Sequence, residues 1–402
     1  MKVPAFLLIS LGTAQLIGAN TNCAPEPPAT CNPDDCCRTY CLGPTNVGIS
    51  APVRPFTCDG DWVITASGFY WNAHMDGLEY AIETQVKSDA QQLGILTRSE
   101  LIDAEYKNPN FKWDFGFKLG IGYNTTCDGW DMSAVWTHYH GKASSHDEAE
   151  KDDNSTLLPI WSDYNMILDQ KPPVQRPPLY ATDIQTEWNL KLDLIDIELG
   201  RERWESKKLT IRPHVGLRIA FIDQKLTIKH KGGSWSEGDD QMKLVNLFQN
   251  NEVELENDFK GIGIRGGLDT VWNFGCGWAL YGNSAFSILY GRFHIKHDEA
   301  NRLAEIPFSK TKVLESTNTF RASRFVADFT LGVQWSSLLC DCKYAFAAKL
   351  GWENHLFFDQ NQLWKVRKLE YPGDPSTEDN TYQNSRGSLD TQGWTLTFVF
   401  DF

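Results

Sequence analysis

The sequence lacks the long apolar run that a membrane-spanning helix requires. Beyond its first residues, no segment approaches the roughly 20 consecutive apolar residues that cross a bilayer as a helix. The 402 residues also lack an excess of positive charge, since the formal net charge is −14. This acidic balance argues against a nucleic-acid partner, which would require a basic patch. If the exported chain enters a membrane, it must therefore do so as a closed β-barrel.

Catalytic and cofactor signatures are missing as well. Neither G-x-S-x-G nor H-E-x-x-H occurs. Gly261, Gly263 and Gly266 match G-x-G-x-x-G literally, but they lie inside an alternating segment and not at a strand-to-helix turn. We therefore predict that the protein is not an enzyme and that it holds neither a cofactor nor a metal ion.

Aromatic residues, by contrast, are abundant. They make up 12% of the chain, which contains 15 Trp and 31 Gly, yet the mean hydropathy is −0.39. So many aromatic side chains in a chain that is polar on average argue against both disorder and a helical membrane protein. An outer-membrane barrel or a secreted soluble protein rich in β-structure remains.

The N-terminus, MKVPAFLLISLGTAQLIGAN, has the pattern of a secretory signal peptide. Lys2 is followed by an apolar stretch over residues 3–11 and then by small residues around Gly18 and Ala19. We predict cleavage after Ala19, so that residues 1–19 are removed on export. The alternative is a short buried helix.

Residues 111–123, FKWDFGFKLGIGY, place an apolar side chain at every second position. Successive side chains of a strand point to opposite faces, so one face of this segment is apolar and the other is charged or bare. A tilted transmembrane strand needs only ~9–11 residues. Trp and Tyr near the strand ends suit the aromatic girdles of an outer-membrane barrel.

The same alternation recurs along the chain and predicts ten strands. Further hairpins are expected in residues 74–110, 224–256 and 293–320, so the predicted total is even and about 12 to 16. The ten predicted strands are 61–73, 111–123, 128–140, 186–200, 208–226, 258–272, 277–292, 321–336, 343–353 and 392–402.

The last strand, QGWTLTFVFDF, carries an apolar face up to the final residue. Bacterial outer-membrane barrels typically close with such a strand, and it resembles the signal that the barrel assembly machinery reads. The residues predicted to form this signal are Trp394, Phe398, Phe400 and Phe402.

The connections between the predicted strands alternate between short and long. Outer-membrane barrels pair short periplasmic turns with longer external loops in this way. We therefore predict an all-β fold, a transmembrane antiparallel β-barrel of the bacterial outer membrane, over residues 59–402. An even number of strands places both ends of the barrel chain on the periplasmic side.

Ten cysteines in an exported chain suggest disulfides. They lie in the Pro-rich segment 20–58, predicted to be periplasmic, or in the short turns, and thus all on one side of the membrane. They either cross-link the envelope or staple a loose N-terminal segment. A thiolate metal site is disfavoured because no His has matching spacing. The disulfide candidates are Cys23, Cys31, Cys36, Cys37, Cys41, Cys58, Cys127, Cys276, Cys340 and Cys342.

The inward-facing positions of the predicted strands carry charges of both signs, so strong ion selectivity is not expected. Residues 158–178 either constrict the lumen or lie on the external surface. The predicted pore-lining residues are Lys112, Asp114, Lys118, Asp131, Lys191, Asp193, Arg212, His214, Arg218, Arg265, Asp269, Asp328 and Lys349.

Four stretches resemble the chlamydial major outer membrane protein family, and Legionella has a similarly named group. They are GFYWNAHMDGLEYA, WDFGFKLGIGYN, LDLIDIELGRERW with LTIRPHVGLRIAF, and the Phe-terminated last strand. The resemblance spans about residues 58–402. It implies an abundant, surface-exposed porin of about 16 strands in a disulfide-linked envelope complex. The stretch CNPDDCCRTYC matches the family's cysteine-rich start only loosely.

We therefore expect an outer-membrane porin for small hydrophilic solutes that also has a structural role in the envelope. The alternative is a surface adhesin or binding barrel that acts through its external loops around a plugged lumen. An outer-membrane enzyme is a third class. The expected partners are outer-membrane lipid, the barrel assembly machinery, further copies of the chain in a trimer, and Cys-rich envelope proteins, but no nucleic acid.

Overall fold

The structure is a computed structural model. It describes residues 52–54, 60–85, 103–125, 129–149, 155–162, 181–232, 249–303, 310–339, 344–370 and 378–402. Within these ranges no helix is long and apolar enough to span a membrane. The predicted signal peptide (1–19) lies outside the described residues, as does most of the segment 20–58.

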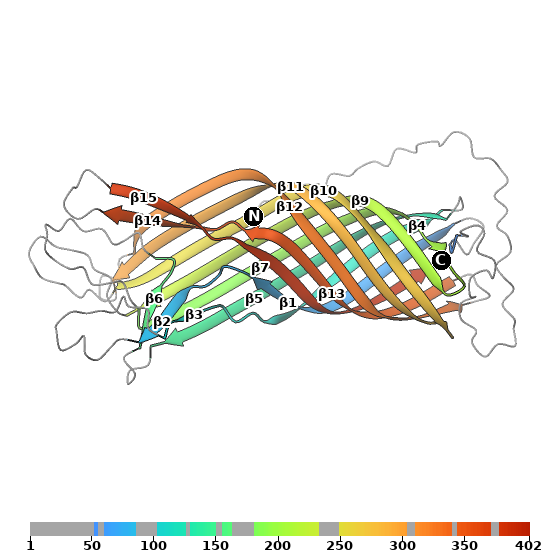
Figure 1. Ribbon diagram of the computed structural model, residues 1–402, viewed down its shortest axis with the longest axis horizontal. Helices are drawn as coiled ribbons and strands as arrows, with labels where there is room; N and C mark the ends of the chain where they lie inside the picture. The colour runs from blue at the N-terminus through green and yellow to red at the C-terminus, as the bar shows by residue number, and fades with distance from the viewer. Residues whose placement is uncertain are drawn as a thin grey trace, which may run out of the picture.

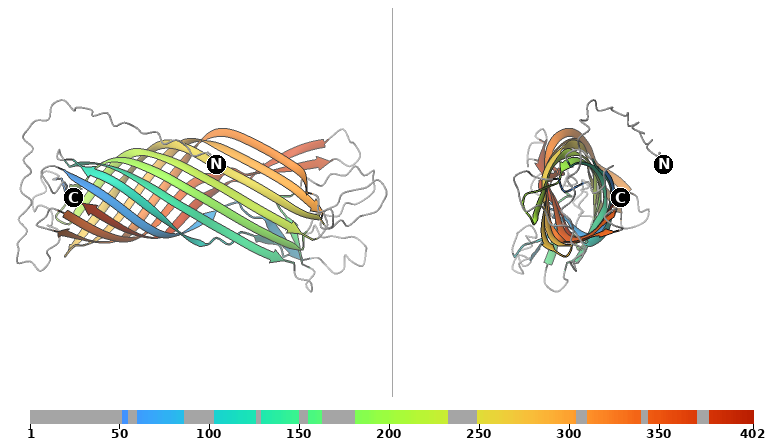
Figure 2. Two further views of the ribbon diagram at one scale, coloured as in Figure 1. Left: turned by 180° about the vertical axis from the view of Figure 1, so that it is seen from behind. Right: turned by 90° about the vertical axis from the view of Figure 1, so that its right-hand side faces the viewer.

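A long β-barrel dominates the molecule (Figure 1), and its strands form a closed ring when the barrel is viewed from one end (Figure 2). The order around the ring is β10-β11-β12-β13-β16-β1-β4-β5-β7-β9, and pairing of β9 with β10 closes it. The ten barrel strands are β1 (Asp61–Met75), β4 (Trp113–Asn124), β5 (Trp130–Glu148), β7 (Asp183–Arg201), β9 (Leu209–Lys231), β10 (Gln249–Gly275), β11 (Trp278–Leu303), β12 (Lys310–Leu339), β13 (Tyr344–Asn361) and β16 (Gly387–Asp401).

The other strands lie outside the ring. Two small sheets lie at the end of the barrel opposite the C-terminus (Figure 1). One has the order β3-β2-β6 and the other pairs β14 with β15, while β8 pairs with β9. These strands are β2 (Ala81–Gln85), β3 (Glu105–Lys107), β6 (Ser155–Pro159), β8 (Arg203–Trp204), β14 (Trp364–Glu370) and β15 (Glu378–Asn384).

The all-β prediction is confirmed, and all ten predicted strands are present, but the barrel total of 12 to 16 is wrong. The segments expected to form extra hairpins mostly lengthen strands that were already predicted. KLTIKHK belongs to β9 and TKVLEST to β12, which run for 23 and 30 residues. EYAIETQ supplies β2, which pairs outside the ring. Strands this long continue far beyond the ~9–11 residues that cross a bilayer.

The outer wall of the barrel next to the C-terminal end is apolar. Large side chains there point away from the barrel and are exposed, as expected for a surface that faces lipid. We call this zone the lipid-facing band. On β10 and β11 it consists of Ile262, Ile264, Leu268, Trp272, Phe274, Trp278, Leu280, Phe286, Ile288 and Tyr290.

Beyond the lipid-facing band the pattern is inverted, and we call this part the outer half. Its outward-facing positions are polar: Glu254, Glu256 and Asp258 alternate with buried Val253, Leu255, Asn257 and Phe259 on β10. Its interior is an apolar core shared by nine of the ten barrel strands, all except β4, and by residues of the small sheets. This core includes Trp71, Met75, Trp188, Leu190, Leu192, Ile222, Leu226, Phe293, Ile295 and Phe357.

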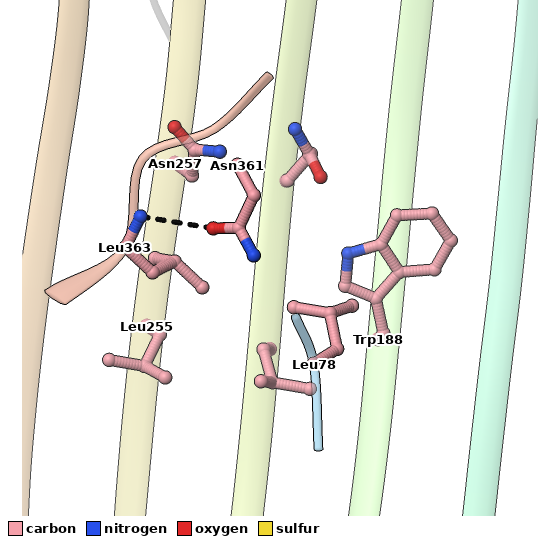
Figure 3. Close-up of a pocket in the computed structure, with 8 residues that line it drawn as sticks. Leu78, Trp188, Leu255, Asn257, Asn361 and Leu363 are labelled. Carbon is pink, nitrogen blue, oxygen red and sulfur yellow. Dashed lines mark hydrogen bonds between the residues drawn. The ribbon is translucent and has the colours of Figure 1, made fainter. Parts of the chain in front are cut away.

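Two chain segments fill the outer mouth of the barrel, and we call them the mouth plug: residues 76–80, after β1, and 359–363, at the end of β13. Leu78 and Leu363 are buried against the inner wall beside Trp188 and Leu255 (Figure 3). The cavity left between them is only about 10 Å³. The mouth plug therefore packs as part of the core.

Hydrogen bonds fix the mouth plug to the wall and tie its two segments together. The Asn257 side-chain amide on β10 donates to the Gln360 carbonyl at 2.9 Å. Asn361 donates to the Asp76 carbonyl at 2.9 Å and accepts from the Leu363 amide at 3.0 Å. These bonds satisfy polar groups that would otherwise be costly to bury.

Candidate functional site: the charged lumen

Inside the lipid-facing band, charged side chains from seven strands point into the lumen and pair with one another. At its C-terminal end the Arg212 guanidinium on β9 contacts three carboxylates: Asp131 at 2.6 Å, Asp269 at 2.8 Å and Glu198 at 3.4 Å. His214 lies 3.5 Å from Glu198 and 3.7 Å from Asp269. One arginine thus connects β5, β7 and β10.

The middle of the lumen holds two further arginines. Arg218 forms a bidentate pair with Asp196 at 2.6 and 2.7 Å and lies 2.8 Å from Asp328. Arg265 contacts Glu198 at 2.9 Å and also pairs with Asp328. Bidentate guanidinium-carboxylate pairs are among the strongest charge-assisted hydrogen bonds. Arg218 is 1% and Asp328 4% exposed, so water screens these pairs little.

The network continues toward the outer half. His355 lies 2.8 Å from Asp328 and 3.4 Å from Glu353. Glu353 pairs with Lys118 at 2.6 Å, and the Lys118 ammonium lies 5.0 Å from the centre of the Trp71 ring. Trp71 belongs to the apolar core of the outer half, so the ionic network ends directly against that core.

Several of these contacts reach across the lumen. Lys118 is on β4 and Glu353 on β13, and two strands separate them in the ring. Arg218 on β9 and Asp328 on β12 are likewise separated by two strands. We conclude that the ionic network occupies the lumen within the lipid-facing band, as the core and the mouth plug occupy it in the outer half.

Two glycines make room for the network. A Cβ atom on Gly200 would lie 2.6 Å from Nε of Arg212, and one on Gly267 would lie 2.6 Å from Nε2 of His214. Both distances are well inside van der Waals contact. Glycine therefore lets the side chains of neighbouring strands lie across the backbone of β7 and β10.

We expect Gly200→Val to destabilise the barrel by about 1–3 kcal/mol, because the new side chain must push Arg212 away from Asp131. Gly68→Val is the matched control, since Gly68 points outward on β1 and a Cβ there would meet no atom within 4 Å. Urea midpoints of the two refolded variants check this prediction. Equal midpoints would show that the space beside Gly200 is not needed.

Most of the predicted pore-lining residues do point inward. The structure places on the interior Asp114, Lys118, Asp131, Arg212, His214, Arg218, Arg265, Asp269, Asp328 and Lys349. Asp114 accepts a hydrogen bond from the Lys142 amide, and Lys349 lies 5.7 Å from the ring of Tyr281. That these residues line an open pore stays a prediction.

Three predicted pore-lining residues lie on the outer wall instead. Lys191 and Asp193 alternate with the buried Leu190 and Leu192, so they face outward, and Asp193 accepts from the exposed Trp136. Lys112 precedes β4, is exposed and donates to Ser144 on the outer wall of β5. The prediction is wrong here because it took every apolar face as lipid-facing.

The predicted set also lacked four members of the network, two of them for the same reason. Asp196, Glu198, Glu353 and His355 line the lumen but were absent from the predicted set. In LDLIDIEL the apolar positions change from even to odd at Leu194 and Ile195. Before this doublet the apolar side chains face the core, and after it they face lipid. Asp196 and Glu198 alternate with the lipid-facing side chains, so they must point inward.

The interior of the outer half also holds buried polar groups. His230 Nδ1 lies 2.9 Å from Oδ1 of Asn251, whose amide donates to Glu299 at 2.7 Å. Burial lowers the pKa of both His230 and His297 to about 4. An imidazole in the unfolded chain has a pKa of ~6.5. Both histidines are therefore neutral in the folded protein at pH 7.

Stability is expected to fall as the pH drops from about 6.5 to about 4, because only the unfolded chain then binds protons at His230 and His297. Above pH 6.5 both states leave these rings neutral, so stability is insensitive to them. Urea midpoints at pH 7.5 and pH 5 measure the effect. A His230→Gln, His297→Gln double variant should show a smaller loss than the wild type, and an unchanged loss would assign it to other groups.

Of the ten predicted disulfide candidates only Cys276 lies in the described residues, in the tight turn between β10 and β11. It is disulfide-bonded. The other nine, Cys23, Cys31, Cys36, Cys37, Cys41, Cys58, Cys127, Cys340 and Cys342, lie outside the described residues. Their pairing stays a prediction.

The C-terminal strand and the segment 158–178 are partly described. Trp394, Phe398, Phe400 and Phe402 all face outward and are exposed in the lipid-facing band. Of the segment 158–178, residues 158–162 lie at the outer mouth, where Trp161 is buried and donates to the Glu79 carbonyl at 2.8 Å. Residues 163–178 lie outside the described residues.

Within the described ranges, one group has the spacing of metal ligands: His146, Glu148 and Asp183, whose ligand atoms lie within 4.8 Å of one another. All three are on the outer wall, and Lys231 lies 3.7 Å from Asp183. The lysine charge opposes a bound cation, and exposed side chains of this kind occur commonly on protein surfaces. We assign no metal site there.

Three solved structures are similar to this chain at low identity. The outer-membrane protease OmpT from Escherichia coli shares 10% identity at a TM-score of 0.28, over 87% of this chain and 98% of that one. A Pseudomonas aeruginosa FadL homologue shares 6% at 0.22, over 86% and 90%. The Pseudomonas putida toluene transporter TodX shares 8% at 0.17, over 91% and 96%. Likeness at this level says nothing about the activity of this chain.

Comparison at the sequence level gives a family. No curated protein matches the chain. A family model described as the Legionella pneumophila major outer membrane protein precursor matches residues 56–400. The resemblance to chlamydial proteins in particular stays a prediction. Because the match covers nearly all of the barrel, this protein belongs to the Legionella major outer membrane protein family and is a β-barrel of the outer membrane.

Proposed function

We propose that this protein is a closed outer-membrane barrel that stiffens the envelope and presents an external surface, and that it is not an open diffusion porin at rest. The observation that carries this proposal is that buried ion pairs cross the lumen in the lipid-facing band while apolar side chains and the mouth plug pack inside the outer half. This favours the binding-barrel alternative over free diffusion.

Liposome swelling tests the proposal. Vesicles that contain the refolded chain, placed in an isosmotic sugar solution, should swell no faster than empty vesicles. A general porin reconstituted at the same protein-to-lipid ratio is the positive control. Swelling at a rate comparable with that control would refute the closed barrel and restore the porin prediction.

A gated ion path is the second candidate function, and the charged lumen favours it. Ionisable side chains inside a membrane-spanning segment are costly and often mark ion pathways. The outer half shows that apolar side chains can fill this barrel. An Arg218→Ser, Asp328→Ser variant separates the two candidates. Conductance would mean that this central pair is the barrier in an ion path, whereas silence is expected of a closed barrel, in which the core and the mouth plug block the lumen independently of the pair.

The proposed structural role in the envelope rests on the predicted disulfides. Support comes from Cys276, which is disulfide-bonded in a tight turn. We expect the purified chain to run as a disulfide-linked species on a non-reducing gel if further cysteines pair between copies. A monomer that is unchanged by reductant would leave the envelope role without a covalent basis.

A further inference from the structure

Three cations lie side by side on the outer wall, where the lipid-facing band ends and the outer half begins. Lys260 on β10 pairs in register with Arg292 on β11, and Arg292 pairs with Arg321 on β12. All three side chains are exposed and point outward. Two residues nearer the C-terminal end of the barrel, the same strands carry the exposed Ile262 and Tyr290. We call Lys260, Arg292 and Arg321 the basic row.

The basic row differs in its ion pairing from the lysines farther along the outer half. On the same wall, Lys225 pairs with Glu254 at 2.8 Å and Lys296 with Glu256 at 2.7 Å, and Lys312 pairs with Glu315 at 2.7 Å. Lys260, Arg292 and Arg321, in contrast, form no ion pair with any described residue.

The chain as a whole is acidic, with a formal net charge of −14, so carboxylates are plentiful. None of those described pairs with the basic row. Asp258, one row higher on β10, is close enough in sequence to pair with Lys260 but does not. Three neighbouring unpaired cations repel one another, and their arrangement is stabilised when an anion lies over them. An anion that binds this row would therefore come from outside the described part of the chain.

We propose that the basic row binds the phosphate groups of outer-leaflet lipids. The row lies where the apolar wall gives way to polar side chains, which is the level of lipid headgroups. Neighbouring strands are ~4.8 Å apart, so the three cations span about 10 Å. Guanidinium groups bind phosphate oxygens in a bidentate fashion, and Tyr290 suits the interface between apolar and wet surroundings. A headgroup with more than one phosphate fits this row.

Binding of fluorescent diphosphoryl lipid A to the refolded chain in neutral detergent tests the proposal. The test variant is Lys260→Gln, Arg292→Gln, Arg321→Gln, and the control is Lys225→Gln, Lys296→Gln, Lys312→Gln, which removes the same charge from paired lysines on the same wall. Each cation near an anionic lipid surface contributes about fivefold in affinity, so the test variant should bind on the order of 100-fold more weakly. The control should change affinity less than threefold.

Equal losses in both variants would show that only net charge matters and would overturn the site, as would equal binding of dephosphorylated lipid A. Competition by inorganic phosphate at the same concentrations as lipid A would assign the row to soluble phosphate and overturn lipid docking. Heat-modifiable migration on a gel shows that each variant is folded. If the triple variant does not fold, the single Arg292→Gln variant should still lose about fivefold, and Arg292→Lys should regain part of it.

Discussion

Arg218→Met is expected to destabilise the folded barrel by about 3–5 kcal/mol, because it leaves the buried carboxylates of Asp196 and Asp328 without their main partner. Arg218 is 1% exposed and contacts both carboxylates within 2.8 Å. The change keeps most of the side-chain volume, so the loss reports the missing charge and not a cavity. Reversible urea unfolding from lipid vesicles measures the free energy of unfolding.

A double-mutant cycle sharpens this prediction. Asp196→Leu alone should also be strongly destabilising, whereas the Arg218→Met, Asp196→Leu double variant should lose much less than the sum of the two. Lys296→Ala is the control, because its pair with Glu256 is solvent-exposed and contributes at most ~1 kcal/mol. Additive losses in the cycle would mean that Arg218 and Asp196 do not act as a pair.

Trp188→Ala should cost about 3–5 kcal/mol, the usual loss for deleting a fully buried aromatic side chain. Trp188 is 1% exposed and packs beside Leu226, Leu255 and the mouth-plug residue Leu363. Its removal would enlarge the cavity of about 10 Å³ that now separates the plug from the wall. Urea unfolding again gives the loss, and faster proteolysis at the outer mouth should accompany it.

The neighbouring Glu187 provides the matched control, since its exposed side chain lies on the opposite face of the same strand. Glu187→Ala should change stability by no more than about 0.5 kcal/mol. A comparable loss in both variants would contradict the inverted outer half, in which even-numbered residues of β7 face a packed core.

Much of the fold follows from the sequence because the lipid-facing band obeys one simple rule. Within it, large apolar side chains alternate with polar or small ones on most strands, and the segment 111–123 shows this most clearly. The strands were placed correctly for that reason. The number of strands was overestimated because a separate strand and the extension of a neighbouring strand show the same alternation. KLTIKHK, for example, extends β9 and does not form a strand of its own.

The lumen was predicted less completely because the meaning of the apolar face changes along each strand. In the lipid-facing band it points outward, and in the outer half it points inward. Adjacent apolar residues mark the change: Leu194 and Ile195 on β7, and Phe221 and Ile222 on β9. Lys191 and Asp193 were misassigned because they precede the doublet Leu194–Ile195. They therefore belong to the outer half, where polar side chains point outward.

The mouth plug shows neither an alternating pattern nor an apolar doublet in the sequence. Its polar stretch DQNQL reads as an ordinary loop, yet Gln360 and Asn361 are fully buried. Their burial depends on contacts with residues 76–77, just after β1, and with Asn257 on β10, which are far away in the sequence, so single-sequence patterns cannot reveal it. Whether the lumen is open or closed is decided by such contacts.

Planar-bilayer recording of the refolded wild-type chain tests the closed barrel most directly. Protease protection and heat-modifiable migration first establish that the chain has inserted and folded. The closed barrel predicts an inserted protein that shows no steady conductance across moderate voltages. Discrete, long-lived conductance steps in most insertions would contradict it and would mean that the ionic network, the core and the mouth plug leave an open path.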